Sequence, residues 1–442
     1  MTASINPGFR KVLSILAVLA LISASLVTAA EVSGPSGQKL KPIKEPKVGL
    51  PASALNPWVV GVWMHPGMFG REKEAALNKI RQTLDEYLKA GINSLFMLVK
   101  NTTGHVYYDS EIGVKDPAYG WDFFGLFLEE ARKRKMTVHP WFCVFPESSL
   151  LGQVREHPEW LIVGPGREMV RTVNPALPEV RAYEISLMLE LVKKYEVDWV
   201  HLDYIRFPCE PTEPYFSRDA RTLQLFKEES GIDFNALKAR DSGNPYWNVW
   251  LEWNREQVTR FVRELRQELG KTGHQAKISA AVFPDADNAR VLIGQDWLEW
   301  GRQGLVDMLC PMLYTNDLPL FEKLTKRALV ARESIGRQSG AAIMIAGKTE
   351  AQAGTSIKER TADRGKTAAA VGGGVRASTV LICPGIGLIT SHNQATPEIM
   401  LEEIRLAREA GADGVVFFSG GSLKESFLNA LAAPVPQRFS RL

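Results

Sequence analysis

The chain has 442 residues, of which 45% are hydrophobic and 23% charged, and its formal net charge is +3. This composition is typical of a globular protein and excludes a disordered or fibrous chain. Because the net charge is small and no run of Lys and Arg is present, the sequence predicts no nucleic-acid partner.

The first 30 residues have the pattern of a secretory signal peptide. Arg10 and Lys11 precede an apolar run from Val12 to Val27, and small residues follow up to Ala30. The run is short for a stable membrane span, so we expect cleavage and export to the periplasm or the extracellular space, with an uncleaved anchor as the alternative. No second stretch is long and apolar enough to cross a bilayer after cleavage.

Residues 31–55 are rich in Pro, Gly, Ser and Lys and predict a flexible linker, so the folded domain is expected at residues 56–435. Within it, eight apolar segments typical of strands alternate with amphipathic segments typical of helices. The expected strands are Val59–His65, Ile92–Lys100, Met136–Val144, Asp198–Ile205, Lys277–Phe283, Val306–Tyr314, Thr379–Ile386 and Gly414–Ser419. The clearest expected helices are Lys73–Ala90, Phe123–Arg134, Pro178–Tyr195, Tyr246–Gly270 and Pro397–Ala410.

This alternation predicts an α/β fold, a (β/α)8 TIM barrel in which helices cover a closed parallel sheet. Gly91 and Gly411 each follow a predicted helix, where glycine supplies a left-handed cap. An open doubly wound sheet is the alternative, but the first strand leads into no Gly-rich phosphate loop. Residues 337–378, rich in Ala, Gly and Lys, predict a long insertion before the seventh strand, with Ala341–Ala346 as a possible extra strand.

Active sites of such barrels lie at the C-terminal ends of the strands. Along the fourth strand, alternation places Trp199, His201 and Asp203 toward the barrel interior and Tyr204 toward the helices. An acidic residue at the end of a hydrophobic strand is costly to bury without a partner or a purpose. Arg206 is positioned to keep Asp203 ionised, and a purely structural Asp–Arg pair is the alternative.

The other strand ends add polar and aromatic side chains to the same rim. Glycosidic cleavage requires two carboxyl groups, so with Asp203 as nucleophile or base we consider Asp285 first as the acid, then Asp317, and Glu147 third. Aromatic rings stack on sugars and short polar groups bind hydroxyls, although core packing is the usual role of any single ring. The candidate substrate-binding residues are Trp63, His65, His139, Trp141, His201, Arg206 and Tyr314.

A metal site is the competing interpretation of the histidines. His65, His139 and His201 could face the same space as Asp203 and bind Zn²⁺, but the first strand lacks a paired His-x-His, so no metal and no cofactor are predicted. The four cysteines form no C-x-x-C pair, which excludes zinc ribbons and thioredoxin chemistry; disulfides and free thiols both stay open.

Four segments, namely Trp58–His65, His201–Pro208, Pro311–Tyr314 and Gly411–Ser419, resemble the glycosyl hydrolase-like 10 family of exported glycosidases. The resemblance covers residues from about Trp58 to about Leu423, and the His201–Pro208 block is its most specific part. It implies a (β/α)8 barrel, export to the bacterial cell envelope and hydrolysis of a polysaccharide such as peptidoglycan glycan strands. Asp203 matches the acidic position of the family's fourth-strand motif, whereas Phe283-Pro284-Asp285 departs from the family's Pro-Phe-Gly run.

The sequence therefore predicts an exported glycoside hydrolase that acts on a polysaccharide or oligosaccharide. A carbohydrate-binding barrel without catalysis and a metal-dependent hydrolase or deacetylase are the alternatives. No oligomeric state is predicted.

Overall fold

The protein is built around eight parallel strands that follow one another in chain order. A computed structural model describes residues 58–209, 214–236, 244–332, 380–391 and 393–433. The strands are β1 (Val59–Met64), β2 (Ser94–Lys100), β5 (Thr137–Cys143), β8 (Trp199–Asp203), β9 (Lys277–Val282), β10 (Met308–Pro311), β11 (Leu381–Ile382) with β12 (Gly385–Gly387), and β13 (Gly414–Phe418). All eight predicted strand segments are thereby confirmed.

The strands form a ring because the seventh one is shared by both ends of the sheet. The pairing runs from β11 through β10, β9, β8, β5, β2, β1 and β13 to β12. Only Cys383 and Pro384 separate β11 from β12, and a further parallel bridge joins Met312 to Gly385. The predicted (β/α)8 barrel is therefore confirmed.

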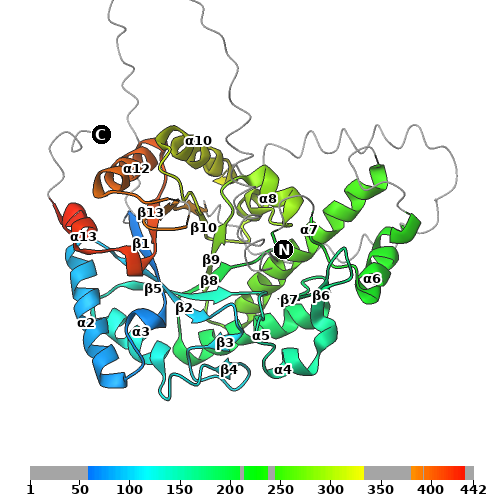
Figure 1. The fold of residues 1–442 in the computed structure, drawn as a ribbon, viewed down its shortest axis with the longest axis horizontal. Helices are drawn as coiled ribbons and strands as arrows, with labels where there is room; N and C mark the ends of the chain where they lie inside the picture. Colours follow the sequence, from blue (N-terminus) through cyan, green and yellow to red (C-terminus); the bar gives the residue numbers. More distant parts are fainter. Residues whose placement is uncertain (1–57, 210–213, 237–243, 333–379, 392, 434–442) are drawn as a thin grey trace, which may run out of the picture. The chain divides into compact units, whose positions relative to one another are not determined.

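Helices surround the strands, as Figure 1 shows. The main ones are α2 (Lys73–Lys89), α3 (Phe123–Lys133), α5 (Pro178–Tyr195), α6 (Ala220–Ser230), α7 (Pro245–Lys271), α8 (Ala286–Leu292), α9 (Trp297–Arg302), α10 (Leu318–Ala328), α12 (Pro397–Ala410) and α13 (Glu425–Ala432). The five predicted helices correspond to α2, α3, α5, α7 and α12. Gly91 and Gly411, with φ of +80° and +89°, take the left-handed conformation expected of helix ends.

Short elements lie in the connections. They are β3 (His105–Val106), β4 (Val114–Lys115), α4 (Gly152–Glu156), the hairpin of β6 (Leu161–Val163) and β7 (Met169–Val173), and 3₁₀ turns at Pro66–Met68, Pro158–Trp160, Phe234–Ala236, Leu329–Arg332 and Gly420–Ser422. The signal peptide (1–30), the linker (31–55) and the insertion (337–378) with its possible strand lie outside the described residues.

Large side chains fill the barrel interior. Trp63, Phe96, Trp199, Met308 and Val416 pack into one buried cluster. They come from strands on different sides of the ring, so each strand contributes to a common core. This packed layer supports the residues at the C-terminal ends of the strands. Among the described residues, no helix is long and apolar enough to span a membrane.

Candidate active site

A cavity of about 290 Å³ opens at the C-terminal ends of the barrel strands. It is lined by Trp63, Leu98, Asn101, Thr102, Trp141, Cys143, Asp203, Tyr204, Arg206, Ala281, Met312, Tyr314 and Phe418. Five of these residues are aromatic, and Asp203 supplies the only carboxyl group in this lining as far as the structure describes it. The C-terminal ends of the strands therefore border a concavity that contains Asp203.

Asp203 is the last residue of β8, and its side chain is almost completely buried. Its Oδ2 accepts a hydrogen bond from the indole Nε1 of Trp141 at 3.1 Å. Its Oδ1 accepts one from the peptide N–H of Tyr204 at 2.6 Å, and Arg206 Nη1 lies 3.4 Å from the same oxygen. Three donors thus face the Asp203 carboxyl group, which in its ionised form accepts hydrogen bonds and donates none.

Two opposing effects set the pKa of Asp203. Burial raises the pKa above the usual aspartate value and is the larger effect. Arg206, the Tyr204 peptide and the Trp141 indole act in the opposite direction by stabilising the carboxylate. The result is a carboxyl group that is more basic than an exposed aspartate but has a preformed set of partners for its charged form.

The aromatic rings of the lining form walls of the cavity that contains this carboxyl group. Tyr314 and Phe418 stack with ring centroids 5.1 Å apart and planes inclined by 17°. The Arg206 guanidinium lies 4.3 Å from the Tyr204 ring centroid, which orients the charge as well as the ring. Burial raises the pKa of Tyr314 well above its usual value, so its hydroxyl stays protonated. Such flat apolar surfaces with polar edges suit the faces of sugar rings.

Below the cavity, a chain of polar groups crosses the barrel core. Trp63 Nε1 donates to His201 Nε2 at 3.0 Å, while His201 Nδ1 and His139 Nδ1 lie 2.9 and 3.0 Å from Ser279 Oγ. Because an indole N–H can only donate, His201 Nε2 must be unprotonated. Burial lowers the pKa of His201 to about 3 and that of His139 well below the usual value, so both rings are neutral.

The predicted substrate-binding residues therefore fall into two groups. Trp63, Trp141, Arg206 and Tyr314 line the cavity beside Asp203. His139 and His201 are buried in the layer beneath it, and His65 is exposed just after β1, outside the lining. Substrate contact by these three histidines stays a prediction. The hydrogen bond between Trp63 and His201 orients the Trp63 ring.

The three predicted acid partners have other contacts. Asp285 is the N-cap of α8 and accepts from the peptide N–H of Asp287 and Asn288; Asp317 caps α10 and accepts from Leu320. Neither residue is part of the cavity lining. Glu147 is buried against Lys100, with 2.7 Å between Nζ and Oε1. Their role as general acid stays a prediction, while the structure shows helix capping and an ion pair.

One orientation predicted from the strand is wrong. Tyr204 was expected to face the helices, but it lines the cavity and is 37% exposed. Its φ of +52° places it in the left-handed region, so the regular alternation of the strand ends at Asp203. This left-handed turn lets the Tyr204 N–H donate to the Asp203 carboxylate, and it explains why Tyr204 does not face the helices.

Sequence reasoning missed Asn101 and Thr102, which follow β2 and line the cavity. The Asn101 side-chain oxygen accepts from the peptide N–H of Thr103 and His105, which closes a tight turn. An Asn followed by Thr-Thr-Gly directly after a buried strand is a turn signal at the catalytic end of a barrel. That signal was present in the sequence and could have identified both residues.

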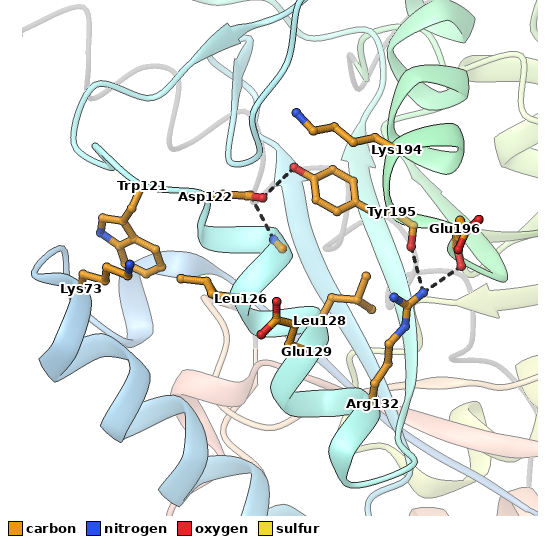
Figure 2. Close-up of a pocket in the computed structure, with 11 residues that line it drawn as sticks. Lys73, Trp121, Asp122, Leu126, Leu128, Glu129, Arg132, Lys194, Tyr195 and Glu196 are labelled. Atoms are coloured by element: carbon orange, nitrogen blue, oxygen red, sulfur yellow. Dashed lines mark hydrogen bonds between the residues drawn. The ribbon is translucent and has the colours of Figure 1, made fainter.

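A larger hollow of about 430 Å³ lies outside the barrel, between α2, α3 and the end of α5 (Figure 2). Two of the polar side chains shown there are bound to the neighbouring helix: Asp122 accepts from Tyr195 Oη at 2.9 Å, and Arg132 donates to the Tyr195 and Glu196 carbonyls at 2.8 Å. These contacts join α3 to α5. We therefore place the chemistry in the smaller inner cavity, where the carboxyl group faces the open space.

Metal ligands and thiols are two further kinds of reactive group in the barrel. Within the residues that the structure describes, no three His, Cys, Asp or Glu side chains are grouped so that they could hold a metal ion. Cys143, Cys310 and Cys383 are buried thiols, and burial raises the pKa of each above its usual value.

Comparison with solved structures supports the architecture. The PgaB (BpsB) glycoside hydrolase domain from Bordetella bronchiseptica is similar with a TM-score of 0.60 at 12% identity, over 85% of this chain and 98% of that domain. α-L-Fucosidase isoenzyme 2 from Paenibacillus thiaminolyticus gives a TM-score of 0.51 at 13% identity, over 85% of this chain and 48% of that one. At these identities the likeness shows a fold that glycoside hydrolases share.

Sequence relatives point to a family. The chain is 23% identical to the glycosyl hydrolase YngK of Bacillus subtilis over 52% of its own length, and 24% identical to the glycosyl hydrolase DigH of Escherichia coli over 55%. It matches about half of each relative's length, 48% and 58%. The glycosyl hydrolase-like 10 family matches residues 59–360, which include β1 to β10 and Asp203. The chain therefore belongs to the glycosyl hydrolase-like 10 family.

Proposed function

We propose that this protein is an exported glycoside hydrolase that cleaves O-glycosidic bonds in a cell-envelope or extracellular polysaccharide, with Asp203 as its central carboxylate. The observation that carries the proposal is the buried Asp203 carboxyl group facing an aromatic-lined cavity at the catalytic end of a barrel. Membership of a family described as glycosyl hydrolase-like supports the same reaction class.

The chemistry follows from the environment of Asp203. Its hydrogen-bond donors favour the carboxylate, and burial makes that carboxylate more basic than usual. Such a group attacks the anomeric carbon of a bound sugar or takes a proton from an attacking water. Arg206 and Trp141 hold the carboxylate in one orientation, so little reorganisation is needed as charge develops at the sugar.

The proposed substrate class follows from the side chains that line the cavity and from the predicted signal peptide. Trp141, Tyr314 and Phe418 offer ring faces, and the Thr102 side chain offers hydrogen bonds to sugar hydroxyls. Export through the signal peptide in residues 1–30 would bring this cavity to envelope glycans. Peptidoglycan glycan strands are the substrate that we propose to test first.

The test measures release of reducing ends from purified glycan strands stripped of peptide, with cellulose as a control polymer. The proposal predicts turnover of the envelope glycan at a rate that saturates with substrate. Absence of reducing ends from every envelope glycan tested would contradict it. N-terminal sequencing of the protein recovered from the cell exterior tests export separately, since the proposal predicts a chain that begins near Glu31.

A carbohydrate-binding barrel without catalysis is a second candidate. It is favoured by one observation, that the part of the lining described by the structure holds a single carboxyl group. Calorimetry separates the two: heat of oligosaccharide binding without any release of reducing ends favours the binding protein, and binding followed by cleavage favours the enzyme.

A further inference from the structure

A buried ammonium group lies directly behind the cavity. Lys100 is the last residue of β2, and its side chain is 0% exposed. Its Nζ lies 2.7 Å from Glu147 Oε1 and 3.2 Å from Glu184 on α5, and both carboxyl groups are also buried. No step of the proposed reaction uses these three groups. Because buried charges are costly to desolvate, their presence beside the site calls for a role.

A β-bulge aims Lys100 at this position. In the pairing of β2 with β5, Leu98 registers with Trp141 but Lys100 registers with Phe142, so Val99 is an extra residue. Leu98 and Trp141 both line the cavity. Since side chains alternate along a strand, Lys100 would face the cavity without the bulge. The bulge turns it with Phe142 toward the helical layer, where Glu184 meets it.

The ammonium group stabilises the end of β5. It donates to the carbonyl oxygens of Cys143 at 3.2 Å and Val144 at 2.8 Å. The peptide N–H of Val144 in turn donates to the carbonyl oxygen of Asp203 at 2.9 Å, and the Cys143 side chain lines the cavity. Buried carbonyl groups require donors, so Lys100 satisfies peptide groups that are adjacent to Asp203.

The same cluster holds the turn after β2. Thr102, which lines the cavity, accepts through its carbonyl oxygen from the peptide N–H of Ser148 at 3.0 Å. The Glu147 carboxylate packs against the Cα of Gly104, whose φ is +95° and where a Cβ would collide with that carboxylate. The Lys100–Glu147 pair therefore joins the segment after β5 to the turn that carries Asn101 and Thr102.

The protonation states are compatible with a tight cluster. Burial raises the pKa of Glu184 to about 8, partly offset by Lys100, so Glu184 is protonated at neutral pH. Burial alone would lower the pKa of Lys100, but the Glu147 carboxylate 2.7 Å away gives the largest opposing effect, so the pKa rises and the ammonium stays charged.

We propose that Lys100 is a positioning residue: its ammonium, held between Glu147 and Glu184, keeps the Asn101–Thr102 turn and the end of β5 where they line the cavity beside Asp203. The inference rests on the proposed function, because it assigns Lys100 a role in the shape of that site. Lys100 itself does not contact the substrate.

The test variant is the double substitution Lys100→Met with Glu147→Gln. Removing Lys100 alone would leave a buried carboxylate without its counter-charge, which by itself can prevent folding. The double variant removes both charges with side chains of similar length. Arg181→Met with Glu264→Gln is the matched control, since Arg181 is also buried on α5, lies 2.8 Å from Glu264 and donates to the Pro175 and Ala176 carbonyls.

Two readouts are compared between these variants. Both are measured at the same temperature difference below the thermal midpoint of each variant. The proposal predicts faster hydrogen–deuterium exchange of the amides at residues 101–105 in the Lys100 variant alone. It also predicts a kcat/KM for glycan cleavage that falls about 10- to 100-fold, with KM raised, because the turn's hydroxyl-binding groups are displaced. The Arg181 control is expected to keep wild-type kcat/KM.

Unchanged exchange at residues 101–105, or a kcat/KM equal to that of the Arg181 control, would overturn the proposal. If the wild-type protein cleaves no glycan, the proposed function fails, but the exchange rates at the turn still decide whether the ammonium holds it. The two failures are therefore distinguishable.

Discussion

The cavity at the barrel mouth and the hollow between α2, α3 and α5 differ in what their carboxyl groups do. In the outer hollow, Asp122 caps α3 and accepts from Tyr195, so its oxygens stabilise the packing of two helices. In the inner cavity, Asp203 is held by Trp141 and Arg206 and faces open space lined by aromatic rings. The larger volume belongs to the outer hollow, yet the arrangement suited to chemistry belongs to the inner one.

The difference teaches that volume alone does not locate a site in this fold. An aspartate that precedes a helix finishes the hydrogen bonding of the first turn, as Asp122, Asp285 and Asp317 do. Asp203 ends a strand, and its carboxylate is held by an indole, a peptide N–H and a guanidinium. Substitutions at the two kinds of aspartate should therefore separate activity from stability.

Replacement of Asp203 by Asn is expected to have the largest effect. It removes the group that reacts with the sugar or the water, so we expect kcat/KM to fall by about 10³-fold or more. Release of reducing ends measures the loss, and the thermal midpoint checks that the variant is folded. Activity within 10-fold of wild type would remove Asp203 from its central role.

Replacement of Arg206 by Met is expected to reduce kcat/KM about 10- to 100-fold at neutral pH and to shift its pH dependence. Arg206 lowers the pKa of Asp203, so its loss should raise that pKa further. The carboxylate is needed ionised, and activity is lost as the pH falls through its pKa. The acid limb of kcat/KM against pH should therefore move to higher pH, and a shift to lower pH would contradict the account.

Replacement of Trp141 by Phe keeps the ring but removes the donor to Asp203 Oδ2. We expect a smaller loss, about 10-fold in kcat/KM, because a hydrogen bond to a charged group contributes about 1.5 kcal/mol at the low end of its range. The acid limb should move in the same direction as for the Arg206 variant, since the indole also lowers the pKa of Asp203. Wild-type kcat/KM with an unshifted limb would show that this hydrogen bond plays no part.

Replacement of Asp285 by Asn tests the predicted acid partner. Asn caps a helix about as well as Asp, and Asp285 is outside the cavity lining, so we expect kcat/KM within about threefold of wild type. A loss above 100-fold without loss of stability would instead establish Asp285 as the general acid. Asp317→Asn serves as the parallel measurement.

Replacement of Asp122 by Ala in the outer hollow should leave kcat/KM unchanged and reduce stability. It removes the cap of α3 and the contact with Tyr195, and a lost cap costs about 1 kcal/mol. Denaturant unfolding measures the stability, and the glycan assay measures the activity. Loss of activity in a fully folded variant would place a second functional site in the outer hollow.

The architecture was predictable because the signals are local. The eight strands and the barrel were predicted from apolar segments that end before polar residues, and from glycines that follow helices, such as Gly91 and Gly411. Asp203, Trp63 and Trp141 followed from alternation along the strands, and Arg206 and Tyr314 from their positions at or just after strand ends. These five residues meet in one cavity because parallel strands bring their ends to the same edge.

The other features depend on departures from regular geometry. The left-handed turn at Tyr204 and the bulge at Val99 change which way Tyr204 and Lys100 point, and no residue pattern predicts either. Asp285 and Asp317 were expected at the rim because they follow strands. Each also precedes a helix, and its side chain caps the first turn of that helix. A sequence does not show which of two such roles a carboxyl group takes.

The account is tested most directly by a crystal structure of the Asp203→Asn variant soaked with an oligosaccharide cut from its glycan substrate. The account predicts a sugar between the aromatic walls of the inner cavity, with its anomeric carbon about 3 to 3.5 Å from the residue 203 side chain for direct attack, or separated from it by one water. A sugar bound between α2, α3 and α5, with the inner cavity empty, would contradict it.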